Sequence, residues 1–222
     1  DATVLRNSAL ININVLYAAH AFGVGRIFFS SSACIYHERN QLDPLTNTTE
    51  ESTAYPAAPD SEYGWEKLFS ERLYLAYARN HGMTVRIARY HNVFGPEGAW
   101  NDGREKAPAA VCRKVAEVEN GGSVDIWGDG QQTRSFLYID EAVVGTLRLM
   151  RSNFQGPVNI GSDHAISIDD LVRMVADIAG KQVTINHIPG PTGVRGRVSD
   201  NRLVPEKLNW IPAGHPFPGL RK

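Results

Sequence analysis

The sequence contains little cysteine and no long apolar segment. Only Cys34 and Cys112 occur among its 222 residues, too few for a disulfide framework, which favours a reducing compartment such as the cytoplasm. No apolar run approaches the roughly 20 residues that a transmembrane helix needs. The N-terminus also lacks the basic and apolar regions of an export signal. We therefore expect a cytoplasmic protein that does not bind a membrane.

An excess of one charge sign is also missing. The formal net charge is −1 and the sequence pI is about 6.7, which gives no reason to expect nucleic acid or an anionic membrane as partner. The seven histidines are scattered without the spacing of metal ligands, so we expect no metal centre. The partner that remains is a small molecule or another protein.

Helical and strand patterns alternate along the chain. Apolar residues at helical spacing predict a helix over 4–21, and a buried strand begins at Arg26. Further helices are expected at 61–77, 105–119, 140–150 and 168–179, and strands at 84–88, 124–127, 135–138, 158–160 and 183–187. This alternation predicts an α/β fold with a mainly parallel sheet. Gly23 and Gly25 follow a helix and precede a strand, the reverse of the dinucleotide-binding order.

Tyr63 and Lys67 form the first candidate for catalysis. Tyr63 is the one tyrosine with a lysine four residues later, and this spacing places both side chains on one face of a helix. A nearby ammonium would lower the pKa of the phenol, which could then remove an alcohol proton while hydride leaves the carbon. The alternative is a solvated helix face.

A second group of candidates follows the strand that ends in three serines. Ser32 lies where a parallel sheet usually binds ligands, so it could hold the alcohol that Tyr63 deprotonates. Cys34, two residues later, would face the same pocket and could exchange a proton with carbon, or it could be a small buried hydrophobe. Lys106 could be a second proton carrier or a solvated surface charge. Cys112 is expected to pack inside a helix.

Three arginines are candidates for binding a diphosphate. Arg134, Arg195 and Arg197 occur in loops or near strand starts, where a guanidinium could form paired hydrogen bonds with phosphate oxygens. Surface arginines are common in proteins. The sequence alone therefore leaves both interpretations open for each of the three.

Four segments together resemble the extended short-chain dehydrogenase/reductases that act on nucleotide sugars. They are Phe29-Ser-Ser-Ser-Ala33, Tyr63-Gly-Trp-Glu-Lys67, Arg89-Tyr-His-Asn-Val-Phe-Gly-Pro96 and the stretch 127–140. The resemblance extends over nearly the whole chain. It implies an incomplete Rossmann-type doubly wound parallel sheet over residues 1–95, and a smaller C-terminal substrate-binding lobe over 96–222 from which segments around 139–162 return to the sheet.

The resemblance also implies an epimerase chemistry. Segments 31–36, 103–110 and 188–197 are similar to those of family members that invert two sugar carbons. By this resemblance, Tyr63 and Lys67 would oxidise C4 of the sugar with NAD. Cys34 and Lys106 would exchange protons at C5 and C3. A homodimer is expected, formed by the helix from Val4 and the helix around Tyr63. The implied cofactor-binding residues are Ser31, Tyr63, Lys67, Arg89 and His91, and the implied substrate-binding residues are Ser32, Asn92, Lys106, Lys114, Gln132, Arg134 and Arg195.

The sequence departs from the family pattern in several places. The first strand, its glycine-rich turn and further βα units are not found, so we expect this chain to bind NAD weakly. His37 replaces a proline that often follows Ile-Tyr, and the helix expected after Trp210 is missing. Alternatives are a nucleotide-sugar 4-epimerase, a 4,6-dehydratase, or a non-catalytic remnant that keeps the substrate lobe.

Overall fold

The structure is a computed structural model that describes residues 2–43 and 49–213. The helices are α1 (Ala2–Ala21), α2 (Glu62–His81), α3 (Ala107–Glu117), α4 (Ile139–Arg151), α5 (Ile168–Ala179) and α6 (Leu203–Leu208), with 3-10 turns η1 (Ala33–Ile35), η2 (Glu38–Gln41) and η3 (Glu51–Ala54). The strands are β1 (Arg26–Ser32), β2 (Thr84–Tyr90), β3 (Val93–Phe94), β4 (Ser123–Trp127), β5 (Thr133–Ser135), β6 (Leu137–Tyr138), β7 (Pro157–Ile160), β8 (Ala165–Ser167), β9 (Thr184–Ile188) and β10 (Gly196–Arg197).

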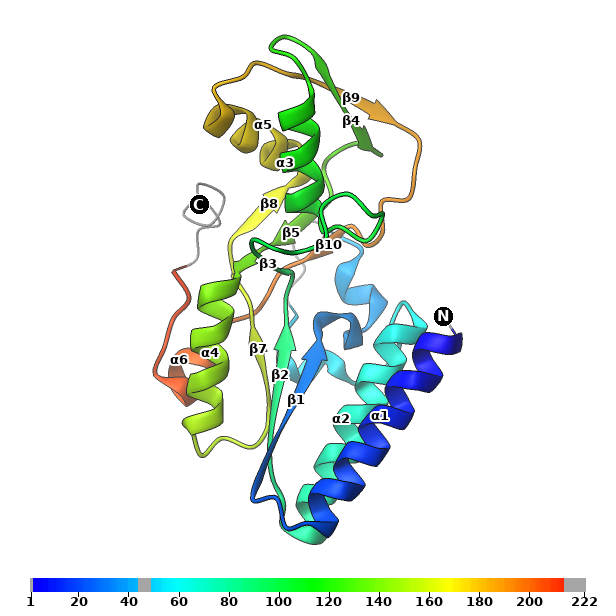
Figure 1. The fold of residues 1–222 in the computed structure, drawn as a ribbon, viewed down its shortest axis with the longest axis vertical. Coiled ribbons are helices and arrows are strands. Elements are labelled where there is room, and N and C mark those ends of the chain that lie inside the picture. The colour runs from blue at the N-terminus through cyan, green and yellow to red at the C-terminus, as the bar shows by residue number, and fades with distance from the viewer. Residues whose placement is uncertain (1, 44–48, 214–222) are drawn as a thin grey trace.

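The larger lobe is built on a parallel sheet in the order β1-β2-β7. Helices α1 and α2 lie side by side on one face of this sheet, and α4 lies on the other (Figure 1). Within the described residues, no strand pairs with the outer edge of β1. An α/β fold with helices on both faces of a parallel sheet is confirmed.

The side chains of β2 alternate between two hydrophobic cores, one on each face of the sheet. Val85 and Ile87 pack with Leu16 of α1 and Phe29 of β1 on the α1/α2 face. Ala88 points to the opposite face, because successive strand residues alternate. There it joins a second cluster with residues from α4, β7 and α6. The sheet is therefore covered on both faces, as parallel sheets usually are.

The smaller lobe has its own core between α3 and α5. Strands β4 and β9 pair in parallel, while β5 pairs in parallel with β10 and antiparallel with β8. Val111 and Val115 of α3 face Leu171 and Val172 of α5 in this core, with Ile126 from β4. The lobe thus presents α3 and its loop toward the carboxyl end of the larger sheet (Figure 1).

The predicted elements are largely found, with exceptions among the shortest ones. The strand expected at 135–138 is two strands, β5 and β6, interrupted at Phe136. Strands β3, β8 and β10 and the six-residue helix α6 were not predicted, because two or three residues are too few to show alternation. None of the helices in the described part is long and apolar enough to cross a membrane.

Helix α2, which carries the first catalytic candidates, has defined ends. Ser61 caps its start by accepting a hydrogen bond from the backbone N–H of Gly64 at 3.2 Å. Gly82 ends the helix with φ of 68°, a left-handed conformation that glycine adopts without strain. The position of Tyr63 in the first turn is therefore fixed by the cap that precedes it.

Candidate active site

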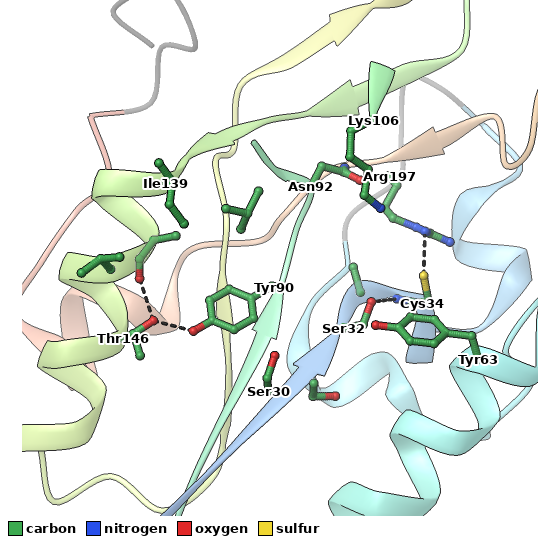
Figure 2. A pocket seen from close by; sticks show the side chains of 15 residues that line it. Ser30, Ser32, Cys34, Tyr63, Tyr90, Asn92, Lys106, Ile139, Thr146 and Arg197 are labelled. Carbon is green, nitrogen blue, oxygen red and sulfur yellow. Dashed lines mark hydrogen bonds between the residues drawn. The ribbon is translucent and has the colours of Figure 1, made fainter. Parts of the chain in front are cut away.

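A cavity of about 410 Å³ opens at the carboxyl ends of β1 and β2. Seven of the candidates from the sequence line it, although they come from elements far apart in the chain. Figure 2 shows the side chains of Tyr63 and Cys34 close to the Ser32 hydroxyl, with Lys106 and Arg197 above them. The candidates that line the cavity are Ser31, Ser32, Cys34, Tyr63, Asn92, Lys106 and Arg197.

Gly64 allows the first turn of α2 to lie against η1. A Cβ atom at position 64 would stand 2.2 Å from the carbonyl oxygen of Cys34 and 2.8 Å from Cβ of Pro59. Both distances are far shorter than van der Waals contact, so only glycine fits there. The close approach brings Tyr63 and Cys34 to the same cavity.

Cys34 is held in place from two sides. Its backbone N–H donates to the Ser32 hydroxyl at 3.2 Å, which caps the short η1 turn. Its sulfur accepts a hydrogen bond from Nη1 of Arg197, also at 3.2 Å (Figure 2). A thiol at this position faces the cavity, as the sequence analysis expected, and it has a cationic neighbour that the sequence analysis did not assign to it.

The pKa of Tyr63 is raised from its ordinary value, contrary to the prediction from its spacing to Lys67. Burial of the phenol raises the pKa, and a hydrogen bond with Ser32 opposes this effect. Lys67 Nζ lies 5.6 Å from the centre of the Tyr63 ring and donates a hydrogen bond to the Ser30 carbonyl at 3.0 Å. Burial is therefore the largest influence on the pKa of Tyr63 in this structure.

The donors around Tyr63 fit one part of a nicotinamide dinucleotide. The Tyr63 hydroxyl and the Lys67 ammonium stand together at the end of β1, and Lys67 keeps donors free after its bond to Ser30. Such a pair can hold a ribose with its hydroxyl groups. Residues 2–43 and 49–213 contain no glycine-rich turn from a strand into a helix that would bind a pyrophosphate, so the fit covers the nicotinamide riboside only.

Three predicted cofactor residues, Lys67, Arg89 and His91, do not line the cavity, and the burial of Arg89 and His91 corrects the expectation from sequence. Arg89 is 3% exposed, and its guanidinium donates to both carboxylate oxygens of Glu71, at 3.0 and 2.8 Å. Ser31, which lines the cavity, donates its hydroxyl to the same carboxylate at 2.5 Å. Arg89 pairs with Ser31 across β1 and β2, and paired residues point to the same face of a sheet.

His91 belongs to the same buried group of polar residues. The ring is fully buried, and Nε2 lies 3.0 Å from the Asn159 side-chain oxygen, which also accepts from the Tyr36 hydroxyl at 2.6 Å. Burial lowers the pKa of His91 to about 3, so the ring is neutral. We call this group the buried network; its members are Ser31, Tyr36, Glu71, Arg89, His91 and Asn159.

A second cavity, of about 380 Å³, lies in the smaller lobe between α3 and the loops after β4 and β9. Lys114, Gln132 and Arg134 line it, as does Trp127. Burial lowers the pKa of Arg134 to about 10, and the charge of Arg197 acts in the same direction. Three of the predicted substrate-binding residues thus share a second cavity, separate from that of Tyr63.

Arg195 lies away from the lining of both cavities. Its guanidinium pairs with Asp129 at 2.8 and 3.1 Å, and this contact lowers the pKa of the carboxyl to about 2. Tyr90 and Thr146 were not predicted from the sequence; both line the first cavity, and their hydroxyl groups bond to each other at 2.5 Å. The signal for Tyr90 was available, because it follows Arg89 in a strand and so faces the other side.

The chain belongs to the NAD dependent epimerase/dehydratase family, which matches residues 1–161. It is 48% identical over 220 residues to GDP-mannose 3,5-epimerase of Arabidopsis thaliana, an alignment that covers 99% of this chain and 58% of the relative. It is 31% identical to UDP-glucuronic acid decarboxylase 3 of the same plant, over 94% of this chain and 59% of that protein. The chain therefore spans less than two thirds of the length of these relatives.

Two solved structures have the same fold. UDP-glucose 4-epimerase of Thermotoga maritima, solved with UDP-glucose, superimposes with a TM-score of 0.87 at 25% identity and covers 99% of this chain and 69% of that one. UDP-glucuronic acid 4-epimerase of Bacillus cereus, solved with UDP-glucuronic acid and NAD, superimposes with a TM-score of 0.80 at 25% identity, over 96% and 64% of the two chains.

Proposed function

We propose that this chain carries the sugar-binding and proton-transferring part of an NAD-dependent epimerase that acts on GDP-mannose at C3 and C5. The observation that supports this most strongly is the presence of Tyr63, Cys34 and Lys106 in one cavity. A 4-epimerase needs only the tyrosine. A thiol and an amine in the same cavity provide the additional acid and base that inversion beside C4 requires.

Each residue has a distinct task. Tyr63 exchanges a proton with the C4 hydroxyl, which Ser32 helps to orient, and bound NAD would take the hydride from C4 and return it. The resulting ketone acidifies the neighbouring C–H bonds. Cys34 or Lys106 removes the proton from one of these carbons, the C–H electron pair moves into an enolate, and the other residue returns a proton to the opposite face.

The second cavity supports binding of the nucleotide part. Lys114, Gln132 and Arg134 provide cationic and amide donors beside the Trp127 ring, a combination suited to a diphosphate and a base. Lys114 Nζ now donates to the Asp125 carbonyl at 2.6 Å, and a phosphate would be a stronger acceptor. Arg195 would contribute only after leaving Asp129.

The test is product analysis by NMR with GDP-mannose in deuterated water. It uses the chain alone and the chain fused to the part of the Arabidopsis thaliana relative that it does not match. We expect the fusion to place deuterium at C3 and C5, and Cys34→Ser and Lys106→Ala to abolish this incorporation while reduced cofactor still forms. Cys112→Ser, whose sulfur packs in the core of the smaller lobe, is the matched control and should remain active.

Other outcomes favour the alternatives. Inversion at C4 alone, with a UDP-sugar, would identify a 4-epimerase. Loss of water from the sugar would identify a dehydratase. A fusion that binds GDP-mannose without any deuterium incorporation would favour a binding remnant. The chain without the fused part is expected to bind NAD weakly, which calorimetric titration measures directly.

We also propose a homodimer through the outer faces of α1 and α2. These adjacent helices expose large apolar side chains, among them Ile11, Tyr17, Trp65 and Phe69, and such a cluster on a surface marks an interface. Phe69→Asp is expected to convert the dimer to a monomer in light scattering. Phe22→Asp, just after α1, is the control and is expected to leave the dimer intact.

A cytoplasmic location is proposed on the basis of the two free thiols.

A further inference from the structure

Arg197 is fixed in position by three side chains of the larger lobe. Its Nε donates to the side-chain oxygen of Gln41, its Nη2 pairs with Asp60 at 3.4 Å, and its Nη1 donates to Cys34 Sγ at 3.2 Å. Gln41 is itself fully buried and donates to the Tyr36 carbonyl at 3.3 Å. The Arg197 side chain is only 12% exposed. It therefore has little freedom to turn away from the sulfur.

We propose that Arg197 is a positioning residue for Cys34, which holds the sulfur toward the sugar and favours its proton-accepting thiolate form. An N–H donor on a cation interacts more strongly with a thiolate than with a neutral thiol. The role of this contact in catalysis rests on the proposed function. The contact itself does not depend on that function.

The assignment of roles to the acid and the base follows from this contact. If Arg197 favours the thiolate, Cys34 takes the proton from carbon in the first inversion and Lys106 donates one from the opposite side. Lys106 occupies the N-cap position of α3, where its side chain makes no capping hydrogen bond, and it lines the same cavity. No co-reactant is needed, because one proton leaves the sugar carbon for sulfur and one returns to it from nitrogen.

Other titratable or charged groups also face Cys34 or its surroundings. Tyr63 of α2 and Arg134 of β5 interact with it electrostatically, and Asp60 and Lys106 lie near the same guanidinium or cavity. Of these, the cations Arg134 and Lys106 could also stabilise a thiolate. The test must therefore separate the direct contact from the general positive potential.

The experiment measures alkylation of Cys34 by iodoacetamide in the 222-residue chain carrying Cys112→Ser, so that Cys34 is the sole thiol. The rate at neutral pH is divided by the limiting rate at alkaline pH, a ratio that removes differences in access to the sulfur. We expect Arg197→Gln to lower this ratio about tenfold, and Arg197→Lys, which keeps a cation, to restore part of it. Arg195→Gln makes the same charge change two residues away and should leave the ratio within about twofold.

The inference is overturned if Arg197→Gln folds normally by circular dichroism and keeps the ratio of the parent chain. It is also overturned if Arg195→Gln lowers the ratio as much as Arg197→Gln, because the effect would then be one of general charge. If Arg197→Gln does not fold, Arg197→Lys is measured in its place. An alkylation ratio equal to that of the parent chain would then show that the guanidinium contact with Cys34 is unimportant, and it would overturn the inference.

A kinetic measurement on the active fusion distinguishes this inference from the proposed function. Arg197→Lys is expected to lower kcat for epimerisation about tenfold, with the KM for GDP-mannose and the formation of reduced cofactor unchanged. If the fusion shows no epimerisation at all, the proposed function fails, while the alkylation ratio still tests the contact between Arg197 and Cys34.

Discussion

Neighbouring residues of β1 and β2 belong to two sets of polar side chains, one buried and one lining the first cavity. Ser31 and Arg89 point into the buried network, where every charge has a partner, whereas Ser32 and Tyr90 point into the first cavity. The cavity keeps donors and acceptors available to a ligand, while the network is fully engaged with protein groups apart from Nδ1 of His91. The two faces of strands β1 and β2 thus separate residues that position the site from residues that face the ligand.

This difference predicts where substitutions affect stability and where they affect activity. A buried ion pair tolerates the loss of one partner poorly, because the other charge is left without compensation. A residue facing a solvent-filled cavity can lose its side chain at little cost to folding. The predictions below test whether the two groups are energetically as distinct as they are in burial.

The largest effect is expected from Arg89→Met. The substitution leaves the Glu71 carboxylate buried, at 2% side-chain exposure, without its cation, and we expect a loss of about 3–5 kcal/mol in the free energy of unfolding. Urea denaturation followed by circular dichroism measures it. Arg173→Met is the control: it breaks a pair with Asp170 that is 60% exposed on both sides and a 3.7 Å contact with Asp169. Asp169 keeps its contact with His187 at 3.0 Å, so the substitution should cost less than about 1 kcal/mol. Equal losses would show that burial does not distinguish the pairs.

The next effect concerns Gly64, where the two regions meet. Gly64→Ala forces a methyl group against the Cys34 carbonyl, and we expect a cost of about 3 kcal/mol from overpacking, reduced by the better helix propensity of alanine. Gly25→Ala is the control, because a Cβ there meets nothing within 4 Å. A stabilised Gly64→Ala protein would mean that α2 can move away from η1 without cost.

Protonation of His91 should make the buried network sensitive to acid. The pKa of the folded ring is about 3 and that of an ordinary histidine is 6.5, so between these values the unfolded chain binds more protons. Stability from this group is complete above pH 6.5 and is lost as the pH falls. Between pH 7 and pH 5 the loss is about 2 kcal/mol, and His91→Gln should lose that much less. Identical pH profiles for the two proteins would contradict the burial of an uncharged ring.

Much of the fold follows from local patterns. Ser61 and Gly82 mark the ends of α2, and the apolar spacing of 168–179 matches α5 residue for residue. The short strands β3 and β10 depend on pairing with distant segments, which no local pattern reveals. Helix α6 was missed because it is only six residues long and contains Pro205.

The residues that line the cavity could be predicted where a motif places a side chain on a known face of a helix or strand. They could not be predicted where a contact with a distant segment determines the position of the side chain. Tyr63 and Cys34 follow from the helix spacing and the strand end. Arg89 was misplaced because the motif gives its position in the chain without the side to which it points. The contact of Arg197 with Cys34 joins residues 163 positions apart, so only the folded chain reveals it.

The smallest effect provides the most direct comparison, between two adjacent serines. Ser31→Ala removes a buried hydrogen bond to the Glu71 carboxylate and should cost about 1–2 kcal/mol in unfolding free energy. Ser32→Ala removes a hydroxyl that faces the cavity and caps the three-residue η1 turn, at a cost of about 0.5 kcal/mol. In binding of the nucleotide sugar to the fusion, measured by calorimetry, the order should reverse, because only the Ser32 hydroxyl reaches the ligand. If Ser31→Ala weakened binding more than Ser32→Ala did, the two faces of β1 would not separate positioning from reaction.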